Sequence, residues 1–336
     1  MTMRIFVFEY ITGGGMLDST LPLSLVQEGD MMLKALISDL AEIDDIDIVA
    51  TRDARLEIPD LPIEFRMLQN LNDFPSAWEA CIESADAVWP IAPEYFQILT
   101  QISEAVLEKG KILLNSPPQA VDTASSKRVT SDLLKESGVQ VVPTYRLEAE
   151  MPDRKGSWVL KPDDGVGCQG TKICRDRDEL HRQLEAVPDG REYVIQPFVH
   201  GMPTSLNILT CQGEAFVLSV NRQRIAMTDN SFVLLGCVVN GYMEQQARFH
   251  KLGRDVAAAI PELWGIVGID TLDTDTGLKV LEVNPRITTS YVGLKESIGV
   301  NPAGLVLDLL NNGMPLSEQF IKAVVVDVNL EYAGAA

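Results

Sequence analysis

Short apolar runs alternate with amphipathic stretches through the first third of the chain. Four runs are too short for buried helices and predict strands; they cover residues 3–10, 46–51, 85–90 and 111–115. Residues 21–40 and 93–109 repeat apolar side chains at helical spacing, and Gly110 is a typical helix stop. Because strands that alternate with helices pair in parallel under helical layers, residues 1–118 predict a doubly wound α/β domain.

A second pattern lies near the other end of the chain. Residues 266–271 and 278–283 are apolar runs joined by Asp-Thr-Asp-Thr-Gly, which predicts a β-hairpin. Residues two apart on a strand share a face, so Glu282 and Asn284 point the same way, and Asp270 on the partner strand can join them. Carboxylate and amide oxygens without His or Cys suit Mg²⁺ or Mn²⁺. Solvated acids on a surface hairpin are the alternative.

Two lysines precede this hairpin in contexts that indicate an anion. After a Ser-Pro-Pro linker at residues 116–118, a helix is expected from about residue 125 to 137. Lys127 stands at its start, where positive charge opposes the helix dipole. Lys161 ends a strand predicted at residues 157–161, immediately before a glycine-rich segment. An ordinary surface lysine is the alternative interpretation of Lys127.

The glycine-rich segment has Gly165, Gly167 and Gly170 at Gly-x-Gly-x-x-Gly spacing. The dinucleotide fingerprint needs a helix directly afterwards. Here residues 171–175 alternate like a strand, so the glycines are expected at the tip of a β-hairpin. Such a tip can lay backbone N–H groups along phosphates and close as a lid.

The remaining pattern predicts further strands and helices. Strands are expected at residues 191–199, 206–209, 215–222 and 323–328, and helices at 178–186, 249–263 and 301–310. Arg222 and Arg224 fall on one side of a strand, where they either bind a carboxylate substrate or face solvent. Gly13–Gly15 follows the first strand as a ligand-facing loop or a plain turn, and it lacks the spacing that a nicotinamide cofactor requires.

Composition disfavours several classes of binding partner and metal site. The 336 residues carry a net charge of −20, which disfavours nucleic acid and anionic membrane surfaces. No segment has the apolar length of a membrane span or the form of a signal peptide. The five cysteines form no Cys-x-x-Cys pair and the three histidines are scattered, so we expect neither disulfides nor zinc, and a cytoplasmic location.

In this order, these features resemble the ATP-grasp superfamily over about residues 1–330. The resemblance implies a doubly wound N-terminal domain (1–118), a small lid sub-domain (119–199) and a C-terminal sub-domain (200–336), with ATP enclosed between the last two. It assigns Lys127 and Lys161 to phosphate contacts, and the loop with Gly165, Gly167 and Gly170 to closure over the β- and γ-phosphates.

The resemblance also assigns the rest of the nucleotide site. Phe198 and Val199 match the hinge whose backbone contacts adenine, and Gln196 stands where a Glu is common. Asp270, Glu282 and Asn284 match the ligands of usually two Mg²⁺ (or Mn²⁺) ions. Arg286 matches the cation that steadies the transferred phosphoryl group. Pro203 departs from the pattern, because an acid often holds the ribose near that position.

The implied activity is an ADP-forming ligase that joins a small-molecule carboxylate to an amine through an acyl phosphate. The N-terminal Phe-Glu-Tyr-Ile-Thr-Gly-Gly resembles the tyramine–glutamate ligase family of methanofuran-type cofactor assembly, which implies glutamate and tyramine. Arg222 and Arg224 would then bind glutamate, and Glu9 or Tyr10 would meet the amine.

Two alternatives remain open. A ligase of the D-alanine–D-alanine type usually has an Arg two residues before the first metal acid, where this chain has Gly268. A non-catalytic nucleotide sensor is the alternative of another class. The sequence leaves the oligomeric state open, with a homodimer as one option.

Overall fold

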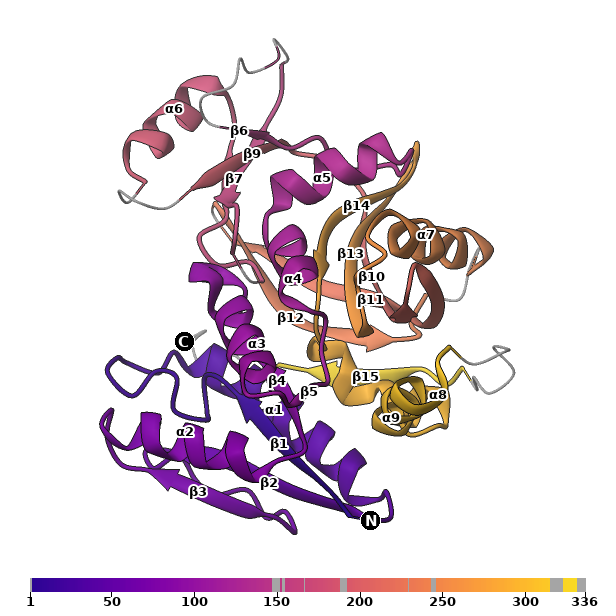
Figure 1. The fold of residues 1–336 in the computed structure, drawn as a ribbon. Coiled ribbons are helices and arrows are strands. Elements are labelled where there is room, and N and C mark those ends of the chain that lie inside the picture. Colours follow the sequence, from indigo (N-terminus) through magenta and orange to yellow (C-terminus); the bar gives the residue numbers. More distant parts are fainter. Residues whose placement is uncertain are drawn as a thin grey trace.

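The computed structural model describes residues 2–330 except 147–151, 153, 154, 166, 188–191, 229, 243–245 and 315–322. The described chain builds three sheets, with one N-terminal domain lying below two further layers (Figure 1). The sequence predicted this α/β architecture, and the element arrangement confirms it.

The N-terminal domain is a five-stranded parallel sheet in the order β3-β2-β1-β4-β5. Its strands are β1 (Met3–Glu9), β2 (Ile46–Asp53), β3 (Glu64–Leu68), β4 (Ala87–Ile91) and β5 (Ile112–Leu113). Its helices are α1 (Leu23–Ala41), α2 (Asp73–Ser84) and α3 (Ile98–Glu108), with a 3₁₀ turn, η1 (Tyr95–Gln97), before α3.

Alternate side chains of β1 enter two different cores. Ile5 and Val7 pack with α1, whereas Phe6 and Phe8 pack with residues of α2 and α3. Both faces of the central strand are therefore covered, which explains why β1 is a continuous apolar run rather than an alternating one. The predicted doubly wound domain is confirmed.

Some elements of the N-terminal domain differ from those that the sequence pattern predicts. β3 and α2 were not predicted, and the burial pattern of β3 is mostly intermediate, as expected for an edge strand. The helix predicted from residue 93 begins only at Ile98, because Phe96 and Gln97 have left-handed backbones (φ 53° and 59°). The expected linker is shorter than predicted, since Pro118 is the first residue of a helix.

The largest sheet is antiparallel, in the order β14-β13-β10-β11-β12-β15. Its strands are β10 (Met202–Cys211), β11 (Glu214–Thr228), β12 (Ser231–Val239), β13 (Gly265–Thr274), β14 (Gly277–Asn284) and β15 (Val326–Asn329). Its associated helices are α7 (Gln246–Ala259), η2 (Thr289–Gly293), α8 (Leu294–Ile298) and α9 (Pro302–Asn312). The strand β12 was not predicted.

A smaller sheet, in the order β6-β9-β7-β8, lies above the large one and carries α6 (Figure 1). Its elements are β6 (Tyr145–Arg146), β7 (Trp158–Pro162), β8 (Lys172–Cys174), α6 (Arg177–Glu185) and β9 (Tyr193–Pro197). Two helices, α4 (Pro118–Ser125) and α5 (Lys127–Glu136), connect it to the N-terminal domain.

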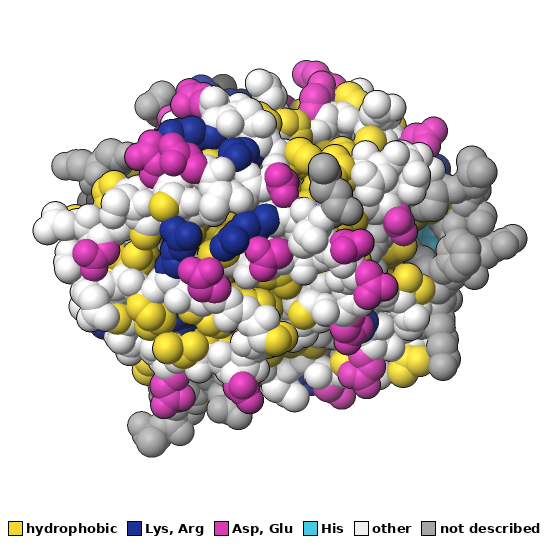
Figure 2. All heavy atoms as spheres, turned by 60° about the horizontal axis from the view of Figure 1, so that its bottom comes forward, with side chains coloured by type: hydrophobic (Ala, Val, Ile, Leu, Met, Phe, Trp, Pro, Cys, Tyr) yellow, Lys and Arg dark blue, Asp and Glu magenta, His cyan; other side chains and the backbone are white. Residues whose placement is uncertain are grey.

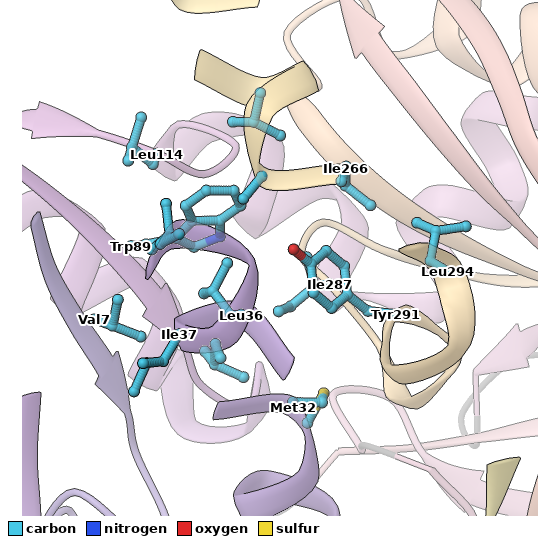
Figure 3. Packing of buried hydrophobic residues seen from close by; sticks show 14 of the residues in the cluster. Val7, Met32, Leu36, Ile37, Trp89, Leu114, Ile266, Ile287, Tyr291 and Leu294 are labelled. Atoms are coloured by element: carbon cyan, nitrogen blue, oxygen red, sulfur yellow. The ribbon is translucent and has the colours of Figure 1, made fainter. Parts of the chain in front are cut away.

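The largest core joins the N-terminal domain to the six-stranded sheet. Figure 3 shows Leu36 of α1 on the side of Ile287 and Tyr291, which come from the C-terminal part of the chain. The Tyr291 hydroxyl also donates to the Asp39 carboxylate of α1 at 2.9 Å. This shared core fixes the distance between the N-terminal domain and the hairpin β13–β14.

The surface in Figure 2 carries acidic side chains spread over the whole face, with hydrophobic and basic side chains between them. Among the described residues no helix is long and apolar enough to cross a membrane.

Candidate active site

The hairpin β13–β14 brings the three predicted metal ligands together. Asp270 stands opposite Glu282 in the strand register, and Asn284 stands opposite Gly268 on the same face. Asn284 Nδ2 donates to Asp270 Oδ2 at 3.3 Å, and Gln223 Nε2 of β11, which is separated from β13 by β10, donates to Asp270 Oδ1 at 2.7 Å. An oxygen-rich cluster therefore lies on the sheet face.

The two predicted phosphate lysines point at this cluster. Ser126 caps α5 by accepting from Val129 N–H, which places Lys127 on the first turn. Lys127 Nζ lies 3.4 Å from Glu282 Oε2 and donates to the Gly165 carbonyl at 2.6 Å. Lys161 lies near the end of β7, and its side chain interacts electrostatically with the carboxylates of Glu282 and Asp270. Both lysines are buried.

Burial and proximity perturb the titration of these groups. Burial lowers the pKa of Lys161 to about 8, and repulsion from Lys127 adds to the fall while Glu282 opposes it. Burial and the adjacent Glu282 charge raise the pKa of Asp270. Burial alone would raise the pKa of Glu282, but the ammonium groups of Lys127 and Lys161 outweigh it and lower that pKa.

These perturbations show what the cluster would accept. Two buried carboxylates raise each other's energy, and a divalent cation between them would relieve that repulsion. Asn284 donates through Nδ2, so its carbonyl oxygen is left as a third ligand. Among the described residues no group of three or more His, Cys, Asp and Glu side chains could hold a metal, so the amide is needed to complete the set. The donor chemistry fits Mg²⁺ or Mn²⁺.

The glycine-rich segment forms the predicted β-hairpin tip. β7 and β8 pair antiparallel, with Leu160 opposite Lys172. Gly167 and Gly170 both have positive φ values, 56° and 69°. A Cβ at Gly170 would also lie 2.9 Å from Pro162 Cγ, so the tight return of the loop requires glycine there.

A cavity of about 250 Å³ runs from this cluster to the N-terminal domain. One end is lined by Asp270, Glu282 and Asn284 together with Gly167–Gln169 of the hairpin tip. The other end is lined by residues of β1, α1 and the loop after β4, including Glu9. The oxygen cluster and the N-terminal domain thus line the same cavity.

Arg286 lies on the wall between the two ends. Its Nη2 donates to Glu94 Oε2 at 3.0 Å, and its Nε lies 2.9 Å from Glu94 Oε1. Burial would lower the pKa of Arg286, but the Glu94 carboxylate outweighs burial and raises it. The guanidinium is therefore held charged and fixed, beside the oxygen cluster.

Glu9 is fully enclosed at the end of β1. Its carboxylate accepts from Ile11 N–H at 3.1 Å and from the amide and hydroxyl of Thr12, both at 2.6 Å. Burial raises the pKa of Glu9 to about 7, against those hydrogen bonds. Tyr10 does not line the cavity; its ring packs edge-on against Phe8.

Arg222 and Arg224 are not brought to the cavity. Arg222 is exposed, and Arg224 Nη1 donates to Asp327 Oδ1 of the edge strand at 2.6 Å. The physical reason is strand alternation: Gln223, between them, takes the face that reaches Asp270, so both arginines take the other. The alternative that they face solvent fits Arg222, whereas Arg224 is held in an ion pair with Asp327, and neither arginine lines the cavity.

The predicted adenine residues lie on β9 and the loop after it and do not line the cavity, although the Phe198 ring stacks on Phe232, which does. Gln196 is buried, and its Nε2 donates to the Thr144 hydroxyl at 2.9 Å. The Phe198 amide donates to the Ser157 carbonyl at 2.9 Å, so it is already bonded. Val199 is partly exposed and adjoins the same loop.

The sequence reasoning missed three polar residues of the site. Gln223, Glu94 and Glu28 line the cavity or fix one of its groups. Gln223 carried a signal, because it alternates with two arginines on one strand. Glu94 and Glu28 carried none, since each reaches the site only through the docking of the N-terminal domain.

Comparison with known proteins agrees with this geometry. A model of the ATP-grasp domain matches residues 124–290, and a model of the pre ATP-grasp 3 domain matches residues 46–121. The chain is 25% identical over 315 residues to the tyramine–L-glutamate ligase of Methanocaldococcus jannaschii, covering 92% of this chain and 89% of that protein. The corresponding ligase of Methanocaldococcus fervens is 26% identical over 300 residues, covering 87% and 89%.

Solved structures share the fold. An ATP-grasp superfamily protein from Archaeoglobus fulgidus superposes with a TM-score of 0.71 at 23% identity, covering 98% of this chain and all of that one. The biotin carboxylase domain of the Hydrogenobacter thermophilus 2-oxoglutarate carboxylase, solved with MgADP, gives a TM-score of 0.74 at 16% identity, covering 96% and 73%. With both domain models matched in order, and with the lysines, the glycine hairpin and the oxygen cluster in place, the chain belongs to the ATP-grasp superfamily, as a ligase that resembles the tyramine–L-glutamate ligases over nearly its whole length.

Proposed function

We propose that this ligase joins the side-chain carboxylate of glutamate to tyramine with ATP as the energy source. The proposal is supported by the tyramine–L-glutamate ligases that align with nearly the whole chain. The single structural observation behind it is the continuous cavity. It joins the oxygen cluster and the glycine-rich tip at one end to an N-terminal wall with carboxylates and apolar side chains at the other.

The chain's own groups have separate roles in this proposal. Lys127 and Lys161 hold the phosphates, and their buried positive charge balances negative charge that develops during transfer. Asp270, Glu282 and Asn284, which line one end of the cavity, would hold the divalent metal, with two ions as the family pattern implies. Bound metal supplies charge neutralisation on the phosphate oxygens.

The reaction then needs a carboxylate beside the phosphates. Glutamate oxygen attacks the γ-phosphorus, ADP leaves, and an acyl phosphate forms. Arg286, held by Glu94 at the cavity wall, is placed to steady the transferred group. The tip at Gly167 lines the same space, so it can shield the acyl phosphate from water. The amine then forms the C–N bond and displaces phosphate.

A screen of ADP release with pairs of carboxylates and amines tests the proposal. Glutamate with tyramine is expected to give the highest kcat/KM, with no ADP when either is omitted. A preference for two amino acids would instead indicate a peptide-forming ligase. If the protein binds the nucleotide but releases no ADP with any pair, it is a sensor and the proposal is contradicted.

A further inference from the structure

The second end of the cavity lies at the switch point of the parallel sheet. In the order β3-β2-β1-β4-β5, the chain leaves β1 in one direction and β4 in the other. Ligands of open α/β sheets bind in the crevice at the carboxyl ends of such neighbouring strands. Glu9 ends β1 and Ile91 ends β4, and both line the cavity. The N-terminal domain therefore contributes a wall where a ligand is expected.

Two carboxylates supply the charge of this wall. Glu28, on α1, accepts from the Thr289 hydroxyl at 3.3 Å through Oε2. Within the described chain no hydrogen bond is made to its Oε1. The Glu9 carboxylate packs against the bare backbone of Gly29, the next residue of the same helix, where a Cβ would lie 2.6 Å from Glu9 Cδ. The two acids thus reach the cavity from adjacent positions.

The cation that acts on Glu28, Arg286, is already committed to another carboxylate. Arg286 makes its ion pair with Glu94, and only a weaker electrostatic effect of Arg286 reaches Glu28. Burial raises the pKa of Glu28 and of Glu9, because the hydrogen bonds of both carboxylates, and the Arg286 charge near Glu28, only partly offset their desolvation. A ligand cation would provide it.

Apart from hydroxyls such as those of Ser24 and Thr289, much of the rest of this end is apolar. The side chains around the two acids that could pack on a hydrocarbon body are Ile11, Leu25, Met32, Ile91, Pro93 and Tyr95. An apolar wall with two convergent acids matches a primary amine on an apolar or aryl body better than it matches an amino acid, whose own carboxylate would be repelled.

We propose that this end of the cavity is the acceptor site, in which Glu28 and Glu9 bind the ammonium of an arylalkyl amine and Glu28 sets the selectivity for it. The inference rests on the proposed function. It adds Glu28 to the binding residues and places the carboxylate donor at the other end, beside Arg286 and the oxygen cluster.

The test compares two acceptors on the same acyl phosphate. Hydroxylamine is small and neutral at pH 7.5, so it captures the acyl phosphate without an ammonium or aryl subsite. We expect Glu28→Gln to lower the ratio of kcat/KM for tyramine over hydroxylamine at least tenfold, mainly through the KM for tyramine. Wild type should prefer tyramine to ethylamine. Glu104→Gln, an exposed acid on α3, is the matched control and should keep the wild-type ratio.

The outcomes distinguish a failure of the proposed acceptor site from a failure of the proposed function. If wild type forms no glutamyl hydroxamate with ATP and glutamate, the proposed function fails. If wild type forms it but Glu28→Gln keeps the tyramine-to-hydroxylamine ratio, the acceptor site is elsewhere and the proposed function stands. Circular dichroism of Glu28→Gln at the assay temperature excludes unfolding as the cause of a lowered ratio.

Discussion

Replacing Lys161 by Met should make the protein more stable and the site inactive. The side chain is 8% exposed and lies where burial lowers its pKa from 10.5 to about 8. At about 1.36 kcal/mol per pKa unit, that fall corresponds to about 3 kcal/mol of folding free energy that the charged form costs at pH 7. Met has a similar unbranched stem and no charge, so it removes this cost.

The lowered pKa of Lys161 also predicts how the free energy of unfolding changes with pH. Between about pH 8 and 10.5 the folded protein has lost the Lys161 proton while the unfolded chain retains it. Unfolding takes up a proton in that window, so this group's contribution to stability rises with pH. The stability advantage of Lys161→Met should therefore be greatest at pH 7 and shrink as the pH approaches 10.

Urea unfolding at pH 7 and 9.5, with and without MgATP, measures these effects. We expect Lys161→Met to gain up to about 3 kcal/mol at pH 7 and to lose about 3 kcal/mol of transition-state stabilisation, roughly 100-fold in kcat/KM. Lys251→Met, at an exposed ion pair with Asp255, is the control and should change stability by about 0.5 kcal/mol or less. A Lys161→Met variant that is less stable than wild type at pH 7, or that keeps the wild-type kcat/KM, would refute the reasoning.

Three further changes test other parts of the site. Glu282→Gln should reduce kcat about 100-fold and raise the Mg²⁺ concentration needed for half-maximal ADP release, and an unchanged metal dependence would speak against Glu282 as a ligand. Gly29→Ala should favour the helical conformation by about 1 kcal/mol. It should nevertheless raise the KM for the amine about tenfold, because the new Cβ displaces the Glu9 carboxylate. Gly304→Ala is the control, because its Cβ would have ordinary 3.7 Å contacts, and it should leave that KM unchanged. Glu94→Gln should cost about 3 kcal/mol in urea unfolding by weakening the buried pair with Arg286, and wild-type stability would contradict that assignment.

The predicted part of the site is the part set by local rules. Strand alternation and a turn sequence were enough to place Asp270, Glu282 and Asn284 on one face, and the helix start was enough to single out Lys127. The glycine hairpin followed because the residues after Gly170 alternate like a strand. In each case the relevant contact spans a few residues or one hairpin.

The unpredicted part depends on contacts between distant segments. Glu28 meets Thr289 across 261 positions and Glu94 meets Arg286 across 192, which only the shared core of α1 and η2 determines. The orientation of Arg222 and Arg224 on β11 was ambiguous as well. Strand alternation tells which residues share a face, but it does not tell which face points inward. The left-handed Phe96 and Gln97 carry no glycine or asparagine signal, so the delayed start of α3 was not visible either.

Oxygen transfer tests the central claim most directly. With glutamate labelled by ¹⁸O in its side-chain carboxylate, ATP and tyramine, attack of that carboxylate on the γ-phosphorus should leave one ¹⁸O atom in each inorganic phosphate released, measured by mass spectrometry or ³¹P NMR. Turnover that yields ADP and amide with unlabelled phosphate would contradict an acyl phosphate formed in this cavity.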